Sequence, residues 1–306
     1  MELPKIGLGT CFGSPDEMRR ATGWALENSY RLIDCAPRYE NQRAIGEAIQ
    51  AAIQAQTVKR DEVFVISKLY HTCHRPELVV SALKETLKEL GLEYLDCWMM
   101  HAPWSFVPLK DDEISCTPRE DKFGAMVEDV DFLATWVEME KCVQLGLCKH
   151  IAVSNFSSAQ LERLLQNSTI KPIINQVECH AYFNNERLNQ FCKSKSIKLM
   201  AFHPIGETRV KTDESALRDD PRLAELASKY KKTPAQILLR FAIERGIIPI
   251  PKSGQLERLK ENYNVFDFEL DDSTREALFA MEIPKRFYLH GWIKKLSKFY
   301  PFSDEF

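Results

Sequence analysis

The chain has 306 residues, 44% of them hydrophobic, and its 41 Lys and Arg against 44 Asp and Glu give a formal net charge of −3. This length suffices for a large hydrophobic core, and α/β barrels of this size fold as one domain. A nucleic-acid-binding domain normally carries an excess of basic side chains, so the near balance of charge argues against a nucleic-acid partner.

The N-terminal segment and the cysteines indicate where the protein works. Residues 1–10 lack the basic and long apolar regions of a signal peptide, and no apolar run approaches the roughly 20 residues of a transmembrane helix. The nine cysteines are scattered singly, and an odd count argues against a disulfide framework. We therefore expect a soluble, cytoplasmic, monomeric protein with reduced thiols and no membrane partner.

Short apolar and β-branched runs recur along the chain and predict eight strands. They cover residues 5–10, 31–36, 63–70, 95–102, 150–156, 172–179, 198–205 and 246–253. Segments such as 76–91 and 158–166 lie between them and have apolar residues at steps of three and four, which is the period of an amphipathic helix. Alternating strands and helices imply parallel pairing, so the pattern predicts a single (β/α)8 TIM barrel over residues 1–306.

Three connections are longer than ordinary barrel turns. They are residues 103–131, residues 207–220 and the C-terminal loop 282–306. We expect these long loops to lie over the C-terminal face of the barrel, with the C-terminal loop covering a pocket there.

Asp34, Lys68 and His101 lie near the ends of three successive predicted strands, 34 and 33 positions apart. In a parallel barrel the carboxyl ends of the strands form one face, and active sites lie on that face. Tyr39 follows Asp34 by five residues, in the loop after the second strand. The spacing therefore predicts that these four side chains meet.

The residue types suit proton transfer. A buried lysine and a buried aspartate are each costly alone but compensate each other as a pair. A tyrosine, with an ordinary pKa of about 10, donates a proton poorly unless a nearby cation such as Lys68 favours its phenolate. Neutral His101 offers one N–H to a polar substrate atom. Together these groups would protonate an oxyanion as it forms, which reduction of a carbonyl by hydride requires.

A series of motifs resembles the aldo-keto reductase superfamily nearly from end to end. The motifs are GLGT (7–10), IDCAPRYENQRAIGEAI (33–49), FVISKL (64–69), LGLEYLDCWMMHAP (90–103), VSNF (153–156), NQVECH (175–180), IPKS (250–253), RLKENYNVFDFEL (258–270) and YPFSDEF (300–306). The catalytic tetrad of that family falls on Asp34, Tyr39, Lys68 and His101. The resemblance implies an NADPH-dependent reductase of small carbonyl compounds, with Tyr39 as the proton donor.

The resemblance also implies how the cofactor binds, since the chain has no Rossmann glycine fingerprint and the family binds its dinucleotide across the barrel mouth. Ser154, Asn155 and Gln176 are expected to hold the carboxamide. Phe202 replaces the more usual tyrosine and is expected to stack on the nicotinamide ring.

Lys252 and Arg258 flank a predicted helix start and form a suitable phosphate clamp. In the family these positions, with Ser253 and Asn262, grip the adenosine 2′-phosphate and the adenine, which favours NADPH over NADH. The remaining expected cofactor-binding residues are Gly9, Thr10, His203, Ile205 and Glu261.

Two regions depart from the pattern of the family. Glu207 follows His203-Pro204-Ile205-Gly206, where the family commonly has Ser-Pro-Leu-Gly-Ser, so either this carboxylate points away from the pyrophosphate or Arg209 compensates it. In the substrate pocket, Cys11, Tyr70 and Ala102 stand where relatives often have tryptophan. Either the site is wider, or Trp104 or Phe106 fills the space.

Two alternatives to a general carbonyl reductase remain open at the level of sequence. One is a nucleotide-binding barrel without catalysis, such as a channel-associated subunit or a structural protein, against which the intact tetrad weighs. The other is a specialised steroid or prostaglandin ketone reductase. The HTCH segment (71–74) lacks the spacing of a zinc site, so we expect no metal.

Overall fold

Eight parallel strands form the central sheet, in the same order as they occur along the chain. The computed structural model describes residues 2–111, 113–122, 124–206, 217–283, 286–288, 293 and 296–303. The strands are β1 (Leu8–Gly9), β2 (Leu32–Asp34), β3 (Phe64–Leu69), β4 (Leu95–Met100), β9 (Cys148–Ser154), β10 (Ile174–Glu178), β11 (Lys198–Phe202) and β12 (Ile248–Pro249). Each lies within or beside a predicted strand, and the predicted (β/α)8 fold is confirmed.

The sheet closes where the first strand meets the segment after the last. The Gly7 N–H donates to the Pro249 carbonyl at 3.0 Å, and the Gly9 N–H donates to the Pro251 carbonyl at 3.1 Å. Gly9 also forms a parallel bridge with Lys252. Closure needs a residue without a side chain, because a Cβ on Gly9 would lie 2.6 Å from the Ile250 carbonyl oxygen.

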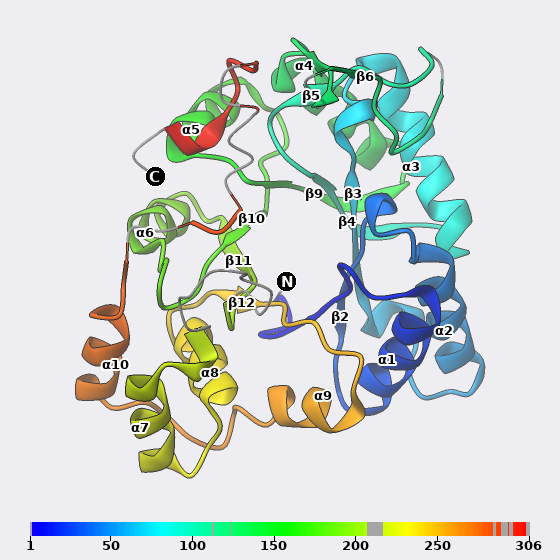
Figure 1. The fold of residues 1–306 in the computed structure, drawn as a ribbon. Coiled ribbons are helices and arrows are strands. Elements are labelled where there is room, and N and C mark those ends of the chain that lie inside the picture. The colour runs from blue at the N-terminus through cyan, green and yellow to red at the C-terminus, as the bar shows by residue number, and fades with distance from the viewer. Residues whose placement is uncertain are drawn as a thin grey trace.

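Ten helices among the described residues form an outer ring around the strands (Figure 1). They are α1 (Pro15–Glu27), α2 (Gln42–Gln54), α3 (Pro76–Leu90), α4 (Phe132–Gln144), α5 (Ser158–Asn167), α6 (Glu186–Ser194), α7 (Pro221–Tyr230), α8 (Pro234–Glu244), α9 (Leu256–Tyr263) and α10 (Asp272–Phe279). Polar caps set several of their starts. In α5 the Ser157 hydroxyl accepts from the Gln160 N–H, and the Gln160 amide oxygen accepts from the Ser157 N–H.

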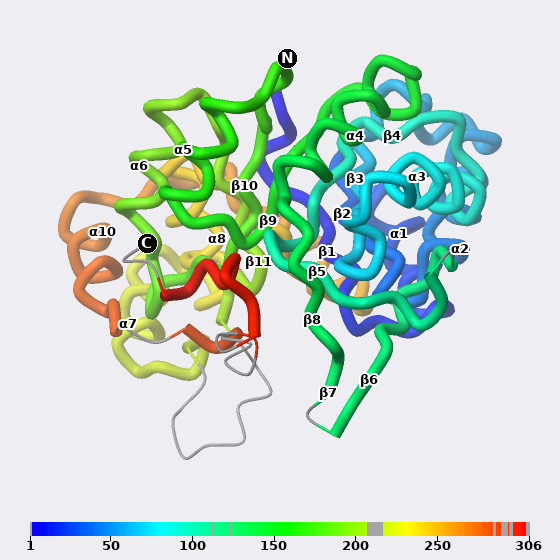
Figure 2. The backbone as a smooth tube through the Cα atoms, turned by 90° about the horizontal axis from the view of Figure 1, so that it is seen from above, coloured from blue at the N-terminus to red at the C-terminus, as the bar shows by residue number. Residues whose placement is uncertain are grey.

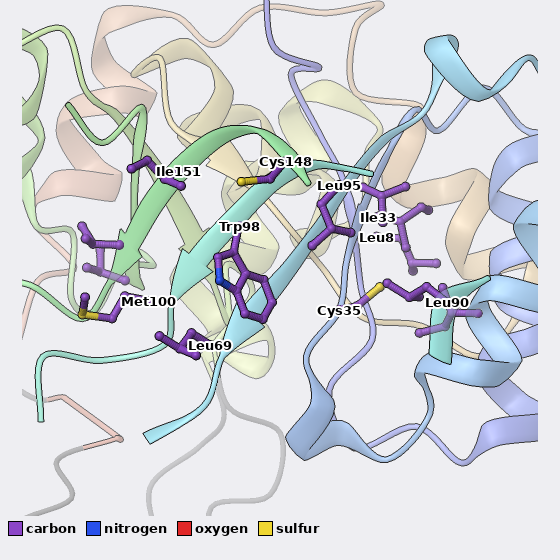
Figure 3. Close-up of a cluster of buried hydrophobic side chains, with 14 of the residues drawn as sticks. Leu8, Ile33, Cys35, Leu69, Leu90, Leu95, Trp98, Met100, Cys148 and Ile151 are labelled. Atoms are coloured by element: carbon purple, nitrogen blue, oxygen red, sulfur yellow. The ribbon is translucent and has the colours of Figure 1, made fainter. Parts of the chain in front are cut away.

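Strand residues alternate between two apolar layers. One layer fills the barrel interior and includes Leu32, Ile66, Met99 and Ile174. The other lies between the strands and the helices, where Figure 3 shows Ile33, Leu69, Trp98 and Cys148 among its members. Every second side chain of a strand points into the barrel. At the carboxyl ends of several strands, the position that points inward is occupied by a polar side chain.

The loops gather at one end of the barrel. Figure 2 shows the N-terminus at one end, and the tail and the connection after β4 at the other. That connection contains two short strand pairs that were not predicted, β5 (Ser105–Phe106) with β8 (Val127–Glu128) and β6 (Glu120–Asp121) with β7 (Gly124–Ala125). Glu207 and Arg209 lie outside the described residues.

The barrel closure can be tested with two glycines. We expect Gly9→Ala to lower the free energy of unfolding by roughly 1–3 kcal/mol, because the added methyl group would overlap a backbone carbonyl. Gly23→Ala, inside α1, should instead stabilise by about 0.5–1 kcal/mol, since no atom lies within 4 Å of the added carbon. Urea unfolding measures both. Equal effects would contradict the close approach at Gly9.

Candidate active site

A buried ion pair lies at the carboxyl ends of β2 and β3. The Lys68 ammonium donates to both oxygens of the Asp34 carboxylate at 2.7 Å, and the two side chains are 0% and 3% exposed. Lys68 also donates to the Cys35 carbonyl at 3.0 Å. These contacts compensate two charges that would each be costly to bury alone.

Tyr39 completes the contact that the spacing predicts. It ends the 3₁₀ turn η1 (Pro37–Tyr39), and its hydroxyl lies 3.2 Å from the Lys68 ammonium, which also lies 4.9 Å from the ring centre. The turn follows β2 directly, so Asp34 and Tyr39 reach Lys68 from one short segment.

The pKa of Tyr39 differs from the sequence-based expectation. Burial raises it well above 10, and the negative charge of Asp34 and a hydrogen bond with the Cys11 thiol act in the same direction. We expected Lys68 to favour the phenolate. That expectation did not allow for Asp34, which neutralises the charge of Lys68 and itself repels a phenolate. Tyr39 therefore keeps its proton throughout the neutral pH range.

His101 stands next to this group at the end of β4. Its ring lies edge-on to the Tyr39 ring with centroids 5.9 Å apart, and edge-on to the Tyr70 ring at 6.1 Å. The His71 ring is stacked behind it at 5.5 Å. The structure thus brings together all four members of the predicted tetrad.

Three side chains expected to hold the carboxamide link the two halves of this site. The Gln176 amide donates to Asp34 Oδ1 at 2.8 Å, and the Ser154 hydroxyl donates to the Gln176 carbonyl at 2.8 Å. The Asn155 amide donates to the His101 carbonyl at 3.0 Å and to the Ser154 hydroxyl at 3.1 Å. These three polar side chains and the tetrad therefore belong to one hydrogen-bonded network.

Phe202 ends β11 beside that network and is only partly buried. The Tyr288 ring lies edge-on to it at 6.0 Å and is stacked on the His203 ring at 4.5 Å. In the turn that follows β11, the Gly206 N–H donates to the His203 carbonyl at 2.8 Å. Ile205 packs against the neighbouring apolar clusters.

The strand-eight region presents polar groups around the start of α9. The Ser253 hydroxyl accepts from the Gln255 N–H at 3.1 Å, and Arg258 is exposed and forms no ion pair with any described residue. Asn262 is only 5% exposed, yet its side chain makes no hydrogen bond with a described residue. Glu261 is engaged elsewhere, since its carboxylate accepts from the Thr233 hydroxyl at 2.7 Å.

Comparison with known proteins places this arrangement. Residues 5–282 match the family model described as "Aldo/keto reductase family". The chain is 40% identical to aldo-keto reductase family 1 member C18 of Rattus norvegicus, over 99% of this chain and 95% of that protein. The chain belongs to the aldo/keto reductase family. It is also 39% identical to the 3-alpha-hydroxysteroid dehydrogenase of Rattus norvegicus, over 99% and 95% of the two chains.

Solved structures agree with this assignment. The aldo-keto reductase of Bombyx mori in complex with NADP superposes with a TM-score of 0.88 at 38% identity, covering 98% of this chain and 95% of that one. The aldose reductase of Schistosoma japonicum gives 0.92 at 37% identity, covering 100% and 97%. This aldo-keto reductase is an NADPH-dependent oxidoreductase of carbonyl compounds, and the predictions of its family, activity and cofactor are confirmed.

The residues present in the reductase fit NADPH. Asn262, only 5% exposed, offers a side-chain amide that makes no hydrogen bond with a described residue. Arg258 offers an exposed guanidinium that forms no ion pair with a described residue, beside a helix start. Phe202 offers a partly exposed aromatic face at the end of β11, the strand that pairs with β10, on which Gln176 lies. Gly9 and Thr10, expected to bind the cofactor, also have structural contacts, since Gly9 bridges to Lys252 and the Thr10 hydroxyl donates to the Asp34 carbonyl at 2.8 Å.

The expected pocket residues form a packed cluster rather than an open space. Ala102 is fully buried with Trp104, Phe106, Ile293 and Tyr300. Tyr70 and Phe302 pack on the edge of this cluster, and Cys11 is partly exposed beside Tyr39. Around Ala102 the packing agrees with the alternative in which Trp104 and Phe106 occupy the space left by the missing tryptophan.

The HTCH segment supports the site through packing. The His71 Nδ1 lies 3.2 Å from the Trp104 carbonyl oxygen, and the two rings stack at 5.2 Å. Burial lowers the pKa of His74 to about 3, so this histidine is neutral. Within the described ranges, no group of three His, Cys, Asp or Glu is placed to hold a metal ion. Nor does any described helix have the length and apolarity to span a membrane.

Glu178, at the end of β10, is a site residue that the sequence reasoning missed. Its buried carboxylate accepts from the backbone N–H groups of Phe287 at 2.8 Å and Tyr288 at 3.0 Å. His180 accepts from the Phe183 N–H through Nδ1, so its Nε2 carries the proton shared with Glu178 at 3.1 Å. The signal was available: Glu178 lies two residues after Gln176 and so points inward.

A cavity of about 550 Å³ lies elsewhere, at the opposite mouth of the barrel. Its lining includes Leu3, His150, Lys198 and Ile248, and none of the tetrad residues. It is therefore separate from the chemistry described above.

The Glu178 anchor gives a pH-dependent expectation. Burial acts to raise the pKa of Glu178, but hydrogen bonds from His180 and from the two tail N–H groups bring it below 4.5. A lowered folded pKa contributes stability that is present above pH 4.5 and is lost as the pH falls through the folded value. Protection of tail amides in hydrogen exchange should therefore be constant from about pH 8 to pH 5 and decline below pH 4.5.

Glu178→Gln should reduce that protection at pH 7 by roughly 1–3 kcal/mol, because one tail N–H loses a charged acceptor. Glu282→Gln is the matched control, since Glu282 is exposed and, among the described residues, accepts only from the Asn184 N–H at 3.4 Å. Unchanged tail exchange in the Glu178 variant would contradict the anchor.

Proposed function

We propose that this enzyme reduces aldehydes and ketones to alcohols with Tyr39 as the proton donor. The observation that carries the proposal is the contact of Lys68 with both the Asp34 carboxylate and the Tyr39 hydroxyl, beside the His101 ring. A barrel that only bound nucleotide would have no need to bury a compensated charge pair against a phenol. The arrangement supports catalysis over the alternative of a non-catalytic barrel.

The proton chemistry follows from the high pKa of Tyr39. The hydride comes from the reduced nicotinamide when NADPH is bound, and it leaves negative charge on the substrate oxygen. An alkoxide is a strong base, comparable to hydroxide ion, so it takes a proton even from a weakly acidic phenol. Tyr39 thus holds its proton until that charge develops.

Lys68, Asp34 and His101 have distinct proposed roles. Lys68 donates a hydrogen bond to the Tyr39 oxygen and stabilises the phenolate once the proton has left. Asp34 fixes Lys68 and keeps the resting site neutral. His101 directs an N–H toward the substrate oxygen, and the rings of Tyr70 and His71 hold its orientation.

For the cofactor, we propose that Asn155, Gln176 and Ser154 hold the carboxamide and Phe202 supports the ring. Lys252, Ser253 and Arg258 would hold the 2′-phosphate, and Asn262 would hold the adenine. The Asn262 side chain makes no hydrogen bond and the exposed Arg258 guanidinium forms no ion pair with any residue that the structure describes, which supports this assignment.

A substrate with an apolar body next to its carbonyl fits best. The predicted pocket residues are mainly aromatic, and Tyr300 and Phe302 of the tail pack among them. A steroid ketone is the second candidate, supported by 39% identity to the rat 3-alpha-hydroxysteroid dehydrogenase.

We also propose that the C-terminal loop covers the pocket and that the enzyme is a monomer. A cytoplasmic location is proposed as well, in line with its nine free cysteines.

The role of Tyr39 is tested by Tyr39→Phe. We expect kcat for aldehyde reduction to fall by ~10²-fold or more, the usual contribution of a general acid, with little change in NADPH affinity. Tyr230→Phe is the matched control, since that hydroxyl bonds Thr274 at 2.9 Å on the outer helices. Steady-state kinetics and cofactor fluorescence measure the two quantities. Turnover near that of the wild type would rule out Tyr39 as the donor.

Cofactor preference is tested by Arg258→Ala. The Kd for NADPH should rise about 10-fold or more and the Kd for NADH should change little, because only NADPH carries the additional phosphate. Lys260→Ala removes the same charge from the same helix, but Lys260 pairs with Glu257 and should leave both constants unchanged. Equal losses for the two cofactors in Arg258→Ala would refute this clamp.

A further inference from the structure

Lys252, the lysine proposed to hold the 2′-phosphate, is already paired with a carboxylate of the chain. Its ammonium donates to Glu17 Oε1 at 2.7 Å, and the two side chains are 32% and 29% exposed. The residues lie 235 positions apart. They meet because the barrel closure at Gly9 and Lys252 brings α1 beside α9.

The position of the Glu17 carboxylate is set from both sides. The Glu17 N–H donates to the Ser14 hydroxyl that caps α1, which fixes Glu17 in the first helical turn. On the other side the carboxylate lies against the backbone of Gly254, where an added Cβ would be 1.9 Å from Glu17 Oε1. Gly254 directly follows Lys252 and Ser253, so Glu17 lies over the segment that leads into α9.

We propose that Glu17 competes with the adenosine 2′-phosphate for Lys252 and thereby limits the preference of this enzyme for NADPH over NADH. The inference rests on the proposed function, because it requires Lys252 to hold that phosphate. A carboxylate and a phosphate are both anions that seek the same cation. NADPH must therefore displace Glu17 from Lys252 or tolerate its charge.

NADH escapes this competition. It carries a neutral 2′-hydroxyl at the corresponding position, and a carboxylate is a good acceptor for a ribose hydroxyl. Glu17 therefore opposes one cofactor and not the other. Arg258 is free of ion pairs with described residues, so it still attracts the phosphate, and Glu17 lowers the preference without reversing it.

The neighbouring acidic residue provides a matched control. Asp16 is next to Glu17 in α1, but its carboxylate pairs with Arg19 at 2.5 Å and makes no contact with Lys252. Glu17→Gln and Asp16→Asn each remove one negative charge from the same helical turn. Only the first removes a competitor at Lys252.

Binding of two cofactor fragments tests the inference without catalysis. Isothermal titration with adenosine 2′,5′-bisphosphate and with ADP should show that Glu17→Gln strengthens binding of the bisphosphate about 3- to 10-fold and changes ADP binding by less than about 2-fold. The ratio of Kd for NADH to Kd for NADPH, measured by fluorescence, should rise by a similar factor. Asp16→Asn should leave every constant near its wild-type value.

Lys252→Met separates failure of this inference from failure of the proposed cofactor site. If Lys252 holds the phosphate, its loss weakens binding of the bisphosphate and abolishes the effect of Glu17→Gln. If Lys252→Met has no effect, the proposed clamp is wrong. If Lys252→Met weakens binding but Glu17→Gln leaves it unchanged or weaker, the competition is overturned. An equal gain in Asp16→Asn would also overturn it, since general charge would then explain the result.

Discussion

The buried contact between Asp34 and Lys68 is the constraint on which the site depends. Both charges are withdrawn from water, and loss of one partner from such a pair typically costs roughly 3–5 kcal/mol. The barrel must therefore bring the ends of β2 and β3 into register with polar partners already in place. Lys68 donates to the Cys35 carbonyl and the Tyr39 hydroxyl, and Asp34 accepts from the Gln176 amide. These hydrogen bonds fix the positions of Tyr39 and Gln176 relative to the ion pair. The need to compensate two buried charges therefore sets the geometry of the site.

The same pair also means that the charges of Asp34 and Lys68 cancel each other in the resting site. A lone lysine would stabilise the phenolate and so lower the pKa of Tyr39. The adjacent carboxylate cancels that influence, and burial also opposes formation of the phenolate. In the proposed mechanism Tyr39 therefore holds its proton at rest, and Lys68 stabilises the phenolate only after negative charge has developed on the substrate oxygen. Gln176 extends this arrangement, because the amide that donates to Asp34 is also one of those proposed to hold the cofactor carboxamide.

Much of this structure could be predicted because the recurrence of apolar runs coincides with the spacing of the polar residues that follow them. The apolar runs located all eight strands, and the repeat of about one strand and one helix between Asp34, Lys68 and His101 placed their side chains at one face. Inward parity carries the same argument to Ser154, Gln176, Phe202 and Lys252, each two residues beyond an inward apolar side chain. Local spacing and parity agreed at these positions.

The contacts that escaped prediction join segments distant in sequence and depend on side-chain packing. Glu17 reaches Lys252 only through barrel closure, and Glu178 reaches the tail across more than a hundred residues. The HTCH segment had been assigned no role beyond the absence of a zinc site, yet His71 packs against His101 and Trp104. The raised pKa of Tyr39 was missed for a related reason, since it reflects burial and a neighbouring charge together.

The anchor at Glu178 has a consequence for how such enzymes diversify. It holds the tail through main-chain N–H groups at two positions, Phe287 and Tyr288. Because every residue except proline carries that donor, the anchor places almost no demand on which side chains stand there. If the tail lines the substrate pocket as proposed, substitutions in it can reshape the walls of that pocket while its attachment to the barrel persists. Catalytic chemistry and substrate range can in this way be inherited separately.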